Sequence, residues 1–216
     1  MKKFAIILSG CGVYDGAEIH EATLSMLAIA KNNATYEIFA PDIQQHHVIN
    51  HITGEEMQET RNVLVESARI ARGKIRTLTD FSADAYDGLL IPGGFGAAKN
   101  LSDWAFNGPG GNVLPEVARV IREMADAGKP IGALCISPVL IVKTLEGARV
   151  TIGSDSDTAG AIEKTGATHV TTTHGEVVMD EQYNLFTTPC YMLDATITQI
   201  ADGAGNIVKA MLERMR

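Results

Sequence analysis

Short apolar runs alternate with amphipathic stretches along most of the chain. Strands that are apolar on both sides and separated by helical segments are typical of a parallel sheet covered by helices on both faces. The expected strands are Phe4–Leu8, Tyr36–Phe39, Gly88–Ile91, Ile131–Leu134 and Val150–Ile152, and the expected helices are Glu18–Lys31, Thr60–Arg69, Val113–Ala127, Pro138–Leu145 and Thr158–Thr165.

The end of the chain departs from this alternation. Val177–Met179 and Leu185–Thr187 flank the polar segment Asp180–Asn184, which predicts a β-hairpin. A final helix is expected up to Met215, with an interruption at Asp202–Gly205. These patterns predict an α/β fold with a mostly parallel sheet and a C-terminal hairpin, in a single domain over residues 1–216.

Composition and charge exclude several classes of protein. The formal net charge is −8 and lysine and arginine form no stripe, so no nucleic-acid partner is expected. No apolar run approaches the roughly 20 residues of a membrane span, and Phe4–Leu8 is expected to be a first strand rather than part of a signal peptide. Three cysteines without C-x-x-C spacing indicate reduced thiols in a cytoplasmic protein, with neither a disulfide framework nor a zinc site.

Candidate chemistry is expected where the predicted strands end, because ligands of open parallel sheets bind at the carboxyl ends of the strands. The longest irregular segment, Pro41–Gly54, is of a length that is often functional. The segments that follow the strands are Ser9–Glu18, Pro41–Gly54, Pro92–Asn100, Cys135–Pro138 and Gly153–Asp157.

Cys135 carries the strongest local signal. It follows a predicted buried strand, and Pro138 suits the first turn of a helix. Small residues two positions away on each side, Ala133 and Ser137, match a nucleophile elbow. In that position the helix N-terminus would favour the thiolate, and the N–H of Ile136 would stabilise an oxyanion. The alternative is that Cys135 is one of the many buried cysteines that only pack.

A glycine-rich turn and a glutamate are the next candidates. Gly93 and Gly94 end another strand and would let main-chain N–H groups approach a ligand, although a plain glycine turn fits equally well. Lys99 stands where a dinucleotide fingerprint requires glycine, which disfavours a nucleotide cofactor. Glu18 would begin a helix, where a carboxylate acts as a cap. Beside a thiol it would instead have a raised pKa and keep its proton.

Other side chains receive weaker interpretations. His47 and His51 are four residues apart, but the residues between them disfavour a helix, so no metal site is predicted. His20 either reaches the cleft or packs. Cys11 is either a resolving thiol or a small buried residue, and Cys190 is interpreted as structural.

The segments that carry these candidates resemble the PfpI/ThiJ branch of the class I glutamine amidotransferase-like superfamily. Within it, the likeness is strongest to a subfamily linked to isoprenoid biosynthesis, and it extends over nearly the whole chain. The residues that carry the resemblance are Ile7–Gly16, Val48–Glu55, Glu59–Asn62, Pro92–Asn100, Cys135–Pro138 and Thr187–Pro189.

The resemblance implies a three-layer, flavodoxin-like sandwich that forms a homodimer. It implies that Cys135 is the elbow nucleophile and that Glu18 is its acidic partner. It also implies that Pro92, Gly93 and Gly94 help to line an oxyanion pocket.

One departure separates the chain from glutamine hydrolases. Those enzymes pair the cysteine with a late His-x-Glu, whereas this chain has Thr187–Cys190 in that region. His174 and Glu176 have the spacing but precede a hairpin strand, so they are discounted and glutamine hydrolysis and peptidase activity are disfavoured. The histidine that other relatives carry about twenty residues after the cysteine also lacks a counterpart, because Ser154–Ser156 occupies that position.

The leading hypothesis is a cofactor-free, glutathione-independent glyoxalase. The Cys135 thiolate would add to glyoxal or methylglyoxal, N–H groups near Gly94 and Ile136 would hold the oxyanion, and Glu18 would move a proton between adjacent carbons. The product would be glycolate or lactate, and no metal or other cofactor is required. The alternative is a regulatory protein in which Cys135 senses oxidants or electrophiles without physiological catalysis.

Overall fold

A seven-stranded sheet forms the centre of the computed structural model, which describes residues 1–215. The strands lie in the order β3-β2-β1-β4-β5-β9-β8, and all neighbours are parallel except β8, which runs antiparallel to β9. The strands are β1 Lys3–Ile7, β2 Thr35–Ala40, β3 Arg76–Thr77, β4 Gly88–Ile91, β5 Ile131–Leu134, β8 Val178–Asp180 and β9 Leu185–Thr188.

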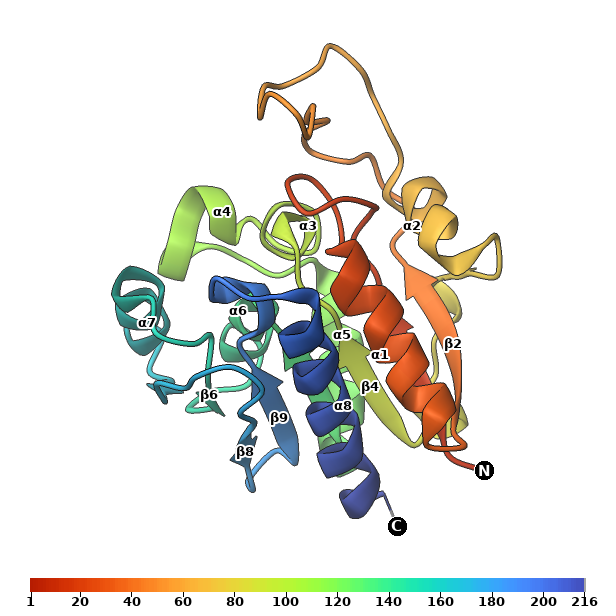
Figure 1. Cartoon of the computed structure of the whole chain (residues 1–216), viewed down its shortest axis with the longest axis vertical. Helices are drawn as coiled ribbons and strands as arrows, with labels where there is room; N and C mark the ends of the chain where they lie inside the picture. The colour runs from red at the N-terminus through yellow and green to blue at the C-terminus, as the bar shows by residue number, and fades with distance from the viewer. Residues whose placement is uncertain (216) are drawn as a thin grey trace.

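Helices cover both faces of this sheet, so the α/β/α sandwich expected from the sequence is confirmed. In Figure 1, α1 and α8 lie side by side in front of the sheet, while α5 lies behind it. The helices are α1 Ile19–Lys31, α2 Val63–Ala71, α3 Phe95–Lys99, α4 Trp104–Asn107, α5 Pro115–Asp126, α6 Pro138–Val142, α7 Ser156–Glu163 and α8 Ile197–Arg214.

Two hydrophobic clusters explain why the central strands are apolar at consecutive positions. In β1, Ile6 packs in the cluster beneath α1 and α8, whereas Ile7 packs in the cluster on the α5 side. In β4, Leu90 and Leu89 divide between the two clusters in the same way. Because side chains alternate across a strand, a sheet buried on both faces needs apolar residues at every position.

Two local expectations need correction. The strand expected at Val150–Ile152 is the two-residue β6, Arg149–Val150, which pairs with β7, Thr168–His169, in a separate small sheet. Helix α8 continues through Asp202–Gly205 without interruption. Gly203 lets α8 pack closely on Cys190, because a Cβ at position 203 would lie only 3.2 Å from the Cys190 sulfur.

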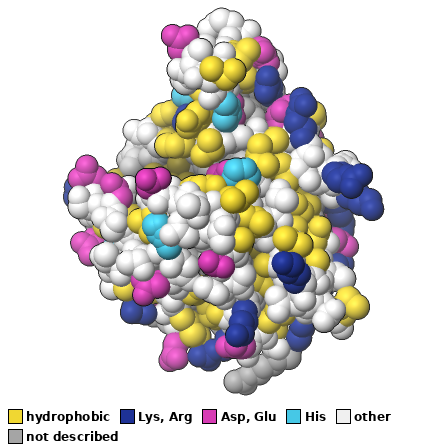
Figure 2. Space-filling view, in the orientation of Figure 1, with side chains coloured by type: hydrophobic (Ala, Val, Ile, Leu, Met, Phe, Trp, Pro, Cys, Tyr) yellow, Lys and Arg dark blue, Asp and Glu magenta, His cyan; other side chains and the backbone are white. Residues whose placement is uncertain are grey.

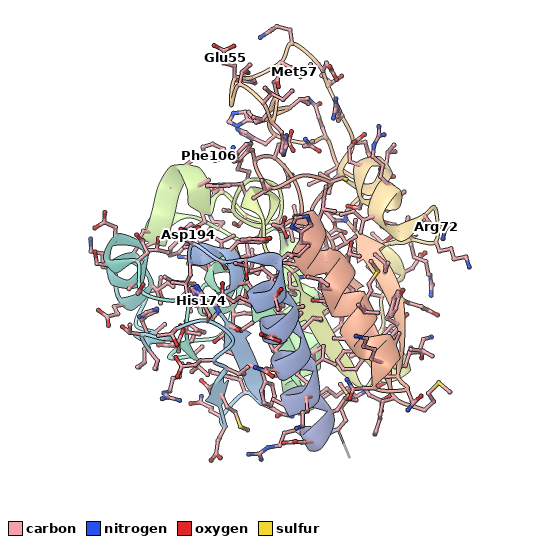
Figure 3. All side chains as sticks on the ribbon, viewed as in Figure 1. Glu55, Met57, Arg72, Phe106, His174 and Asp194 are labelled. Atoms are coloured by element: carbon pink, nitrogen blue, oxygen red, sulfur yellow. The ribbon has the colours of Figure 1, made fainter. Side chains whose placement is uncertain are left out.

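The irregular segment after β2 is longer than Pro41–Gly54 and continues to Asn62, where α2 begins. It rises from the body of the molecule as an arm (Figures 1 and 2), and Glu55 and Met57 lie far out on it in Figure 3. Its base is held to the body by Asn100, whose side-chain oxygen accepts the His46 N–H at 2.9 Å.

The order of the strands predicts where a ligand would bind. From β1 the chain moves first outward to β2 and later returns to β4 on the other side of β1, so the connections reverse direction between β1 and β4. Ligands of doubly wound sheets bind at the carboxyl ends of the strands beside such a reversal. The segments that follow β1, β4 and β5 are therefore the place to look for a site.

None of the helices within residues 1–215 combines the length and apolar character that crossing a bilayer would need.

Candidate active site

Cys135 occupies a strained turn between β5 and α6. Its φ is +58°, in the left-handed region that non-glycine residues seldom adopt. The turn is held by the Cys135 N–H, which donates to the Thr188 carbonyl at 2.9 Å, and by the Ser137 hydroxyl, which donates to the Pro92 carbonyl at 2.7 Å. Strain of this kind persists only where the surroundings enforce it, and it occurs most often at functional sites. The elbow geometry predicted from Ala133 and Ser137 is therefore present.

The thiol is buried, with 6% of Cys135 exposed. Its sulfur accepts hydrogen bonds from the backbone N–H groups of Gly94 and Ile136, which favour the thiolate. Burial, followed by the nearby Glu21 carboxyl, outweighs them and raises the pKa of the Cys135 thiol well above its ordinary value. The expected depression of this pKa by a helix dipole is thus wrong, because α6 is only a short turn of helix and desolvation dominates.

Glu21, on the first turn of α1, is the carboxyl group that contacts the thiol. It is fully buried, and its side chain hydrogen-bonds to Cys135. Its Oε2 accepts the Gly93 N–H at 2.8 Å, and its Oε1 accepts the Tyr191 N–H at 3.2 Å. Burial, followed by the Glu18 carboxylate, raises the pKa of Glu21 to about 8. Near neutral pH this carboxyl therefore keeps its proton for most of the time.

The assignment of Glu18 as the partner of the thiol is corrected by this geometry. Glu18 is the N-cap of α1, and its Oε2 accepts the Glu21 N–H at 2.7 Å. This is the capping role that the sequence also allowed. Glu18 acts on Glu21 through its charge, whereas Glu21 makes the direct contact with Cys135.

The two glycines after β4 have different functions. A Cβ on Gly93 would lie 2.8 Å from both the Cys135 sulfur and Glu21 Oε2, so only glycine leaves room for their contact. The Gly93 N–H is already donated to Glu21, which leaves the N–H groups of Gly94 and Ile136 as the backbone donors near the sulfur. Gly94 has φ +96°, and a Cβ there would lie 2.4 Å from the Gly16 carbonyl oxygen. Glycine is therefore sterically required at both positions, Gly93 for the contact between Cys135 and Glu21 and Gly94 for its approach to Gly16.

A match to a protein-family model identifies the family of this chain. The model described as the DJ-1/PfpI family matches residues 13–190, a range that contains the thiol, the acid and the glycine turn. The chain belongs to the DJ-1/PfpI family. This agrees with the resemblance found in the sequence, which named the PfpI/ThiJ branch of the same superfamily.

Curated relatives of this DJ-1/PfpI protein include vertebrate proteins. The human glutamine amidotransferase-like class 1 domain-containing protein 3, mitochondrial, is 46% identical over 98% of this chain and 82% of its own length. The zebrafish (Danio rerio) ES1 protein, mitochondrial, is 33% identical over 96% of this chain and 84% of its own. Both names specify mitochondria, so the cytoplasmic location inferred from the cysteines stays a prediction.

Solved structures agree on the fold. An isoprenoid biosynthesis protein with an amidotransferase-like domain from Ehrlichia chaffeensis superposes with a TM-score of 0.94 at 38% identity, covering all of both chains. DJ-1beta from Drosophila melanogaster superposes with a TM-score of 0.58 at 16% identity, covering 99% of this chain and 90% of that one. The second similarity supports the shared fold alone.

The two other cysteines of this DJ-1/PfpI chain lie in different surroundings. Cys11 is half-buried beside Glu66 and Arg69, and burial, followed by the Glu66 charge, raises its pKa. Cys190 is buried next to α8, in the same hydrophobic cluster as Cys135. Its φ of +42° marks a second strained turn, which directs the following Tyr191 N–H towards Glu21.

The histidines considered from the sequence are engaged elsewhere. His174 Nε2 lies 3.0 Å from the Asp194 carbonyl oxygen, and Figure 3 shows the two residues near the N-terminal end of α8. Glu176 instead accepts the Thr173 N–H at 2.6 Å, so the His-x-Glu spacing does not form a pair. In the arm, His51 Nε2 accepts the Tyr14 N–H at 3.2 Å. Within residues 1–215 no group of three or more metal-ligating side chains comes together.

The contact that Gly93 permits can be tested by filling the space. Gly93→Ala is expected to lower the free energy of unfolding by about 1–3 kcal/mol, the usual cost of overpacking a dense site. It should also slow alkylation of Cys135 by iodoacetamide, because the added methyl group would lie 2.8 Å from the sulfur and obstruct the approach of the reagent. Urea unfolding and alkylation followed by intact mass measure the two effects.

Gly160 supplies the matched control for that substitution. It lies inside α7, and a Cβ there would meet no atom within 4 Å. Gly160→Ala should leave alkylation unchanged and raise stability by up to about 1 kcal/mol through helix propensity. Equal behaviour of the two variants would show that the space beside Gly93 is not needed for the contact.

Proposed function

We propose that the protein is a cofactor-independent glyoxalase that converts glyoxal to glycolate, or methylglyoxal to lactate. The observation that carries the proposal is the convergence of a thiol, a proton-bearing carboxyl and two backbone N–H donors on one point. A nucleophile, a proton carrier and an oxyanion site are the three components that the isomerisation of an α-dicarbonyl requires.

The first step is addition of the thiol to an aldehyde. The Cys135 sulfur bonds to the carbonyl carbon, the π electrons of that carbonyl move to its oxygen, and the thiol proton passes to the Glu21 carboxylate. The oxygen is held by the N–H groups of Gly94 and Ile136, which hydrogen-bond to the sulfur in the free protein. Return of the proton to that oxygen gives a neutral hemithioacetal.

The second step moves one proton between adjacent carbons. Glu21, as a carboxylate, removes the proton from the carbon bonded to sulfur, and the negative charge moves to the second carbonyl oxygen, which gives an enediolate. Glu21 returns the proton to the neighbouring carbon, and the hydroxyl proton on the sulfur-bearing carbon passes to the second oxygen, which gives a thioester. Water then attacks the thioester carbonyl, the carbon–sulfur bond breaks and the thiol is restored. The sum is glyoxal plus water giving glycolic acid, with no external oxidant or reductant.

The role of Cys135 is tested by removing its sulfur. Cys135→Ser is expected to lower kcat/KM for glyoxal by about a thousandfold or more, because loss of the nucleophile leaves only binding and oxyanion stabilisation. Cys11→Ser is the matched control, since Cys11 lies among the charged residues Glu66 and Arg69, and it should keep normal turnover. Formation of glycolate is measured. Normal turnover by the Cys135 variant would refute the mechanism.

The identity of the acid is tested by measuring how kcat/KM for glyoxal depends on pH. Because the pKa of Glu21 is raised to about 8, the carboxylate that accepts the thiol proton is scarce below that pH. We expect kcat/KM for glyoxal to rise about tenfold per pH unit below pH 8 and to level above it. Glu21→Gln should abolish this rise and slow the reaction by roughly 10²–10⁴-fold.

Glu18→Gln distinguishes the two glutamates. Removal of the Glu18 charge removes the second cause of the raised pKa of Glu21, so the midpoint of the profile should move to lower pH while activity is kept. If Glu18→Gln, rather than Glu21→Gln, flattened the profile, Glu18 would be the proton carrier after all.

A redox or electrophile sensor is the second candidate. The observation in its favour is that the N–H groups which would hold an oxyanion are placed to hold oxygen atoms bonded to the sulfur itself. A sensor reacts once per molecule, whereas an enzyme turns over. A stoichiometric mass increase at Cys135 after mild peroxide, without steady-state glyoxal turnover, would favour the sensor.

A further inference from the structure

A histidine–tyrosine pair lies beside the acid of the site. His20 Nδ1 and the Tyr191 hydroxyl oxygen are 2.9 Å apart, and the two ring centroids are 5.9 Å apart. His20 comes from the first turn of α1, and Tyr191 from the short 3-10 turn Cys190–Met192 after β9. Tyr191 also donates its backbone N–H to Glu21 Oε1. The pair is therefore joined directly to the carboxyl group that contacts Cys135.

The pair keeps one hydrogen-bond donor that the protein does not use. A neutral imidazole has one N–H and a phenol one O–H, and the bond between them uses one of these two donors in either tautomer. Apart from this bond, neither the His20 ring nor the Tyr191 hydroxyl has a partner at hydrogen-bond distance among residues 1–215, and Glu18 Oε1, at 4.0 Å from His20 Nδ1, is too far away. The His20 side chain is 51% exposed, so the pair lies at the surface rather than in the core.

Tyr191 keeps its proton at neutral pH. Burial, followed by the charges of Glu18 and Glu21, raises the pKa of its phenol. A phenolate is therefore not available to compete as an acceptor, and the pair acts as a donor.

An α-dicarbonyl has two carbonyl oxygens on adjacent carbons, and the N–H groups of Gly94 and Ile136 serve only one of them. We propose that His20 and Tyr191 bind the second oxygen and so select α-dicarbonyls over compounds with one carbonyl group. This deepens the proposed glyoxalase function and rests on it for the identity of the substrate class. His20 also gives the site an imidazole, which here comes from α1. The position about twenty residues after Cys135, by contrast, has no histidine and is occupied by Ser154–Ser156.

The inference is tested with a dicarbonyl that binds but cannot isomerise. The two carbonyl carbons of 2,3-butanedione carry no hydrogen, so its adduct with Cys135 stops at the hemithioketal. Propanal is the probe with a single carbonyl group. Each is assayed by the concentration that halves the rate at which iodoacetamide alkylates Cys135 in the full-length protein.

We expect His20→Ala and Tyr191→Phe to raise the half-protecting concentration of 2,3-butanedione about tenfold, the effect of losing a hydrogen bond worth roughly 1.4 kcal/mol. Protection by propanal and the unprotected alkylation rate should stay within about twofold. His20→Gln, which keeps an N–H donor, should recover much of the loss. His174→Ala, which removes a histidine that contacts the Asp194 carbonyl, is the matched control and should resemble the wild type.

Three results would overturn the inference. They are equal weakening of both probes, unchanged protection by 2,3-butanedione in the variants, or no protection of the wild type by 2,3-butanedione. Failure of the proposed function is a separate result, namely that the wild type does not turn over glyoxal. If a selective loss of 2,3-butanedione protection accompanied that failure, recognition of dicarbonyls would stand without the isomerase activity.

Discussion

The contact between the Glu21 carboxyl and the Cys135 thiol is the constraint on which the rest of the site depends. Both groups are buried, and burial is the main cause that raises the pKa of each. The Glu21 carboxyl raises the pKa of the Cys135 thiol further, whereas the hydrogen bond from Cys135 lowers the pKa of Glu21. The contact requires that Gly93 has no side chain, that Cys135 adopts a positive φ, and that Tyr191 turns its N–H towards the acid. Segments after β4, β5 and β9 therefore meet at one carboxyl group on α1.

The fold, the elbow at Cys135 and the glycine turn can be predicted from patterns in the amino-acid sequence. Strands apolar on both faces require helices on both sides, and the small residues around Cys135 indicate an elbow. The glycine turn was recognised, although the different functions of Gly93 and Gly94 depend on contacts with the segments of Cys135 and Gly16. The uninterrupted α8 was missed because packing against Cys190 outweighs the weak helix propensity of Gly203.

The sequence pattern places the acid one helical turn too early, at Glu18 rather than Glu21, and the reason lies in the backbone. A glutamate three residues after an N-cap commonly reaches back to the N-cap N–H. Here the Glu18 N–H donates to the Gly93 carbonyl, so Glu21 is free to turn towards the thiol. A signal was present in the sequence, because Glu21 shares the buried stripe of α1 with Ala22 and Ser25, among other residues. A charged residue on the apolar face of a helix needs an explanation other than packing.

The raised pKa of Glu21 also indicates why this residue is kept. The pKa of Glu21 is about 8 in the folded protein and near 4.5 in the unfolded chain. Between these two pH values the folded protein keeps the Glu21 proton, whereas the unfolded chain has lost it. Stability is therefore lost as pH rises through that window, on the order of 3 kcal/mol by pH 7 at about 1.4 kcal/mol per unit. A packed apolar residue would avoid this cost. A buried carboxyl that opposes folding while contacting a strained thiol is best explained by chemistry at that thiol.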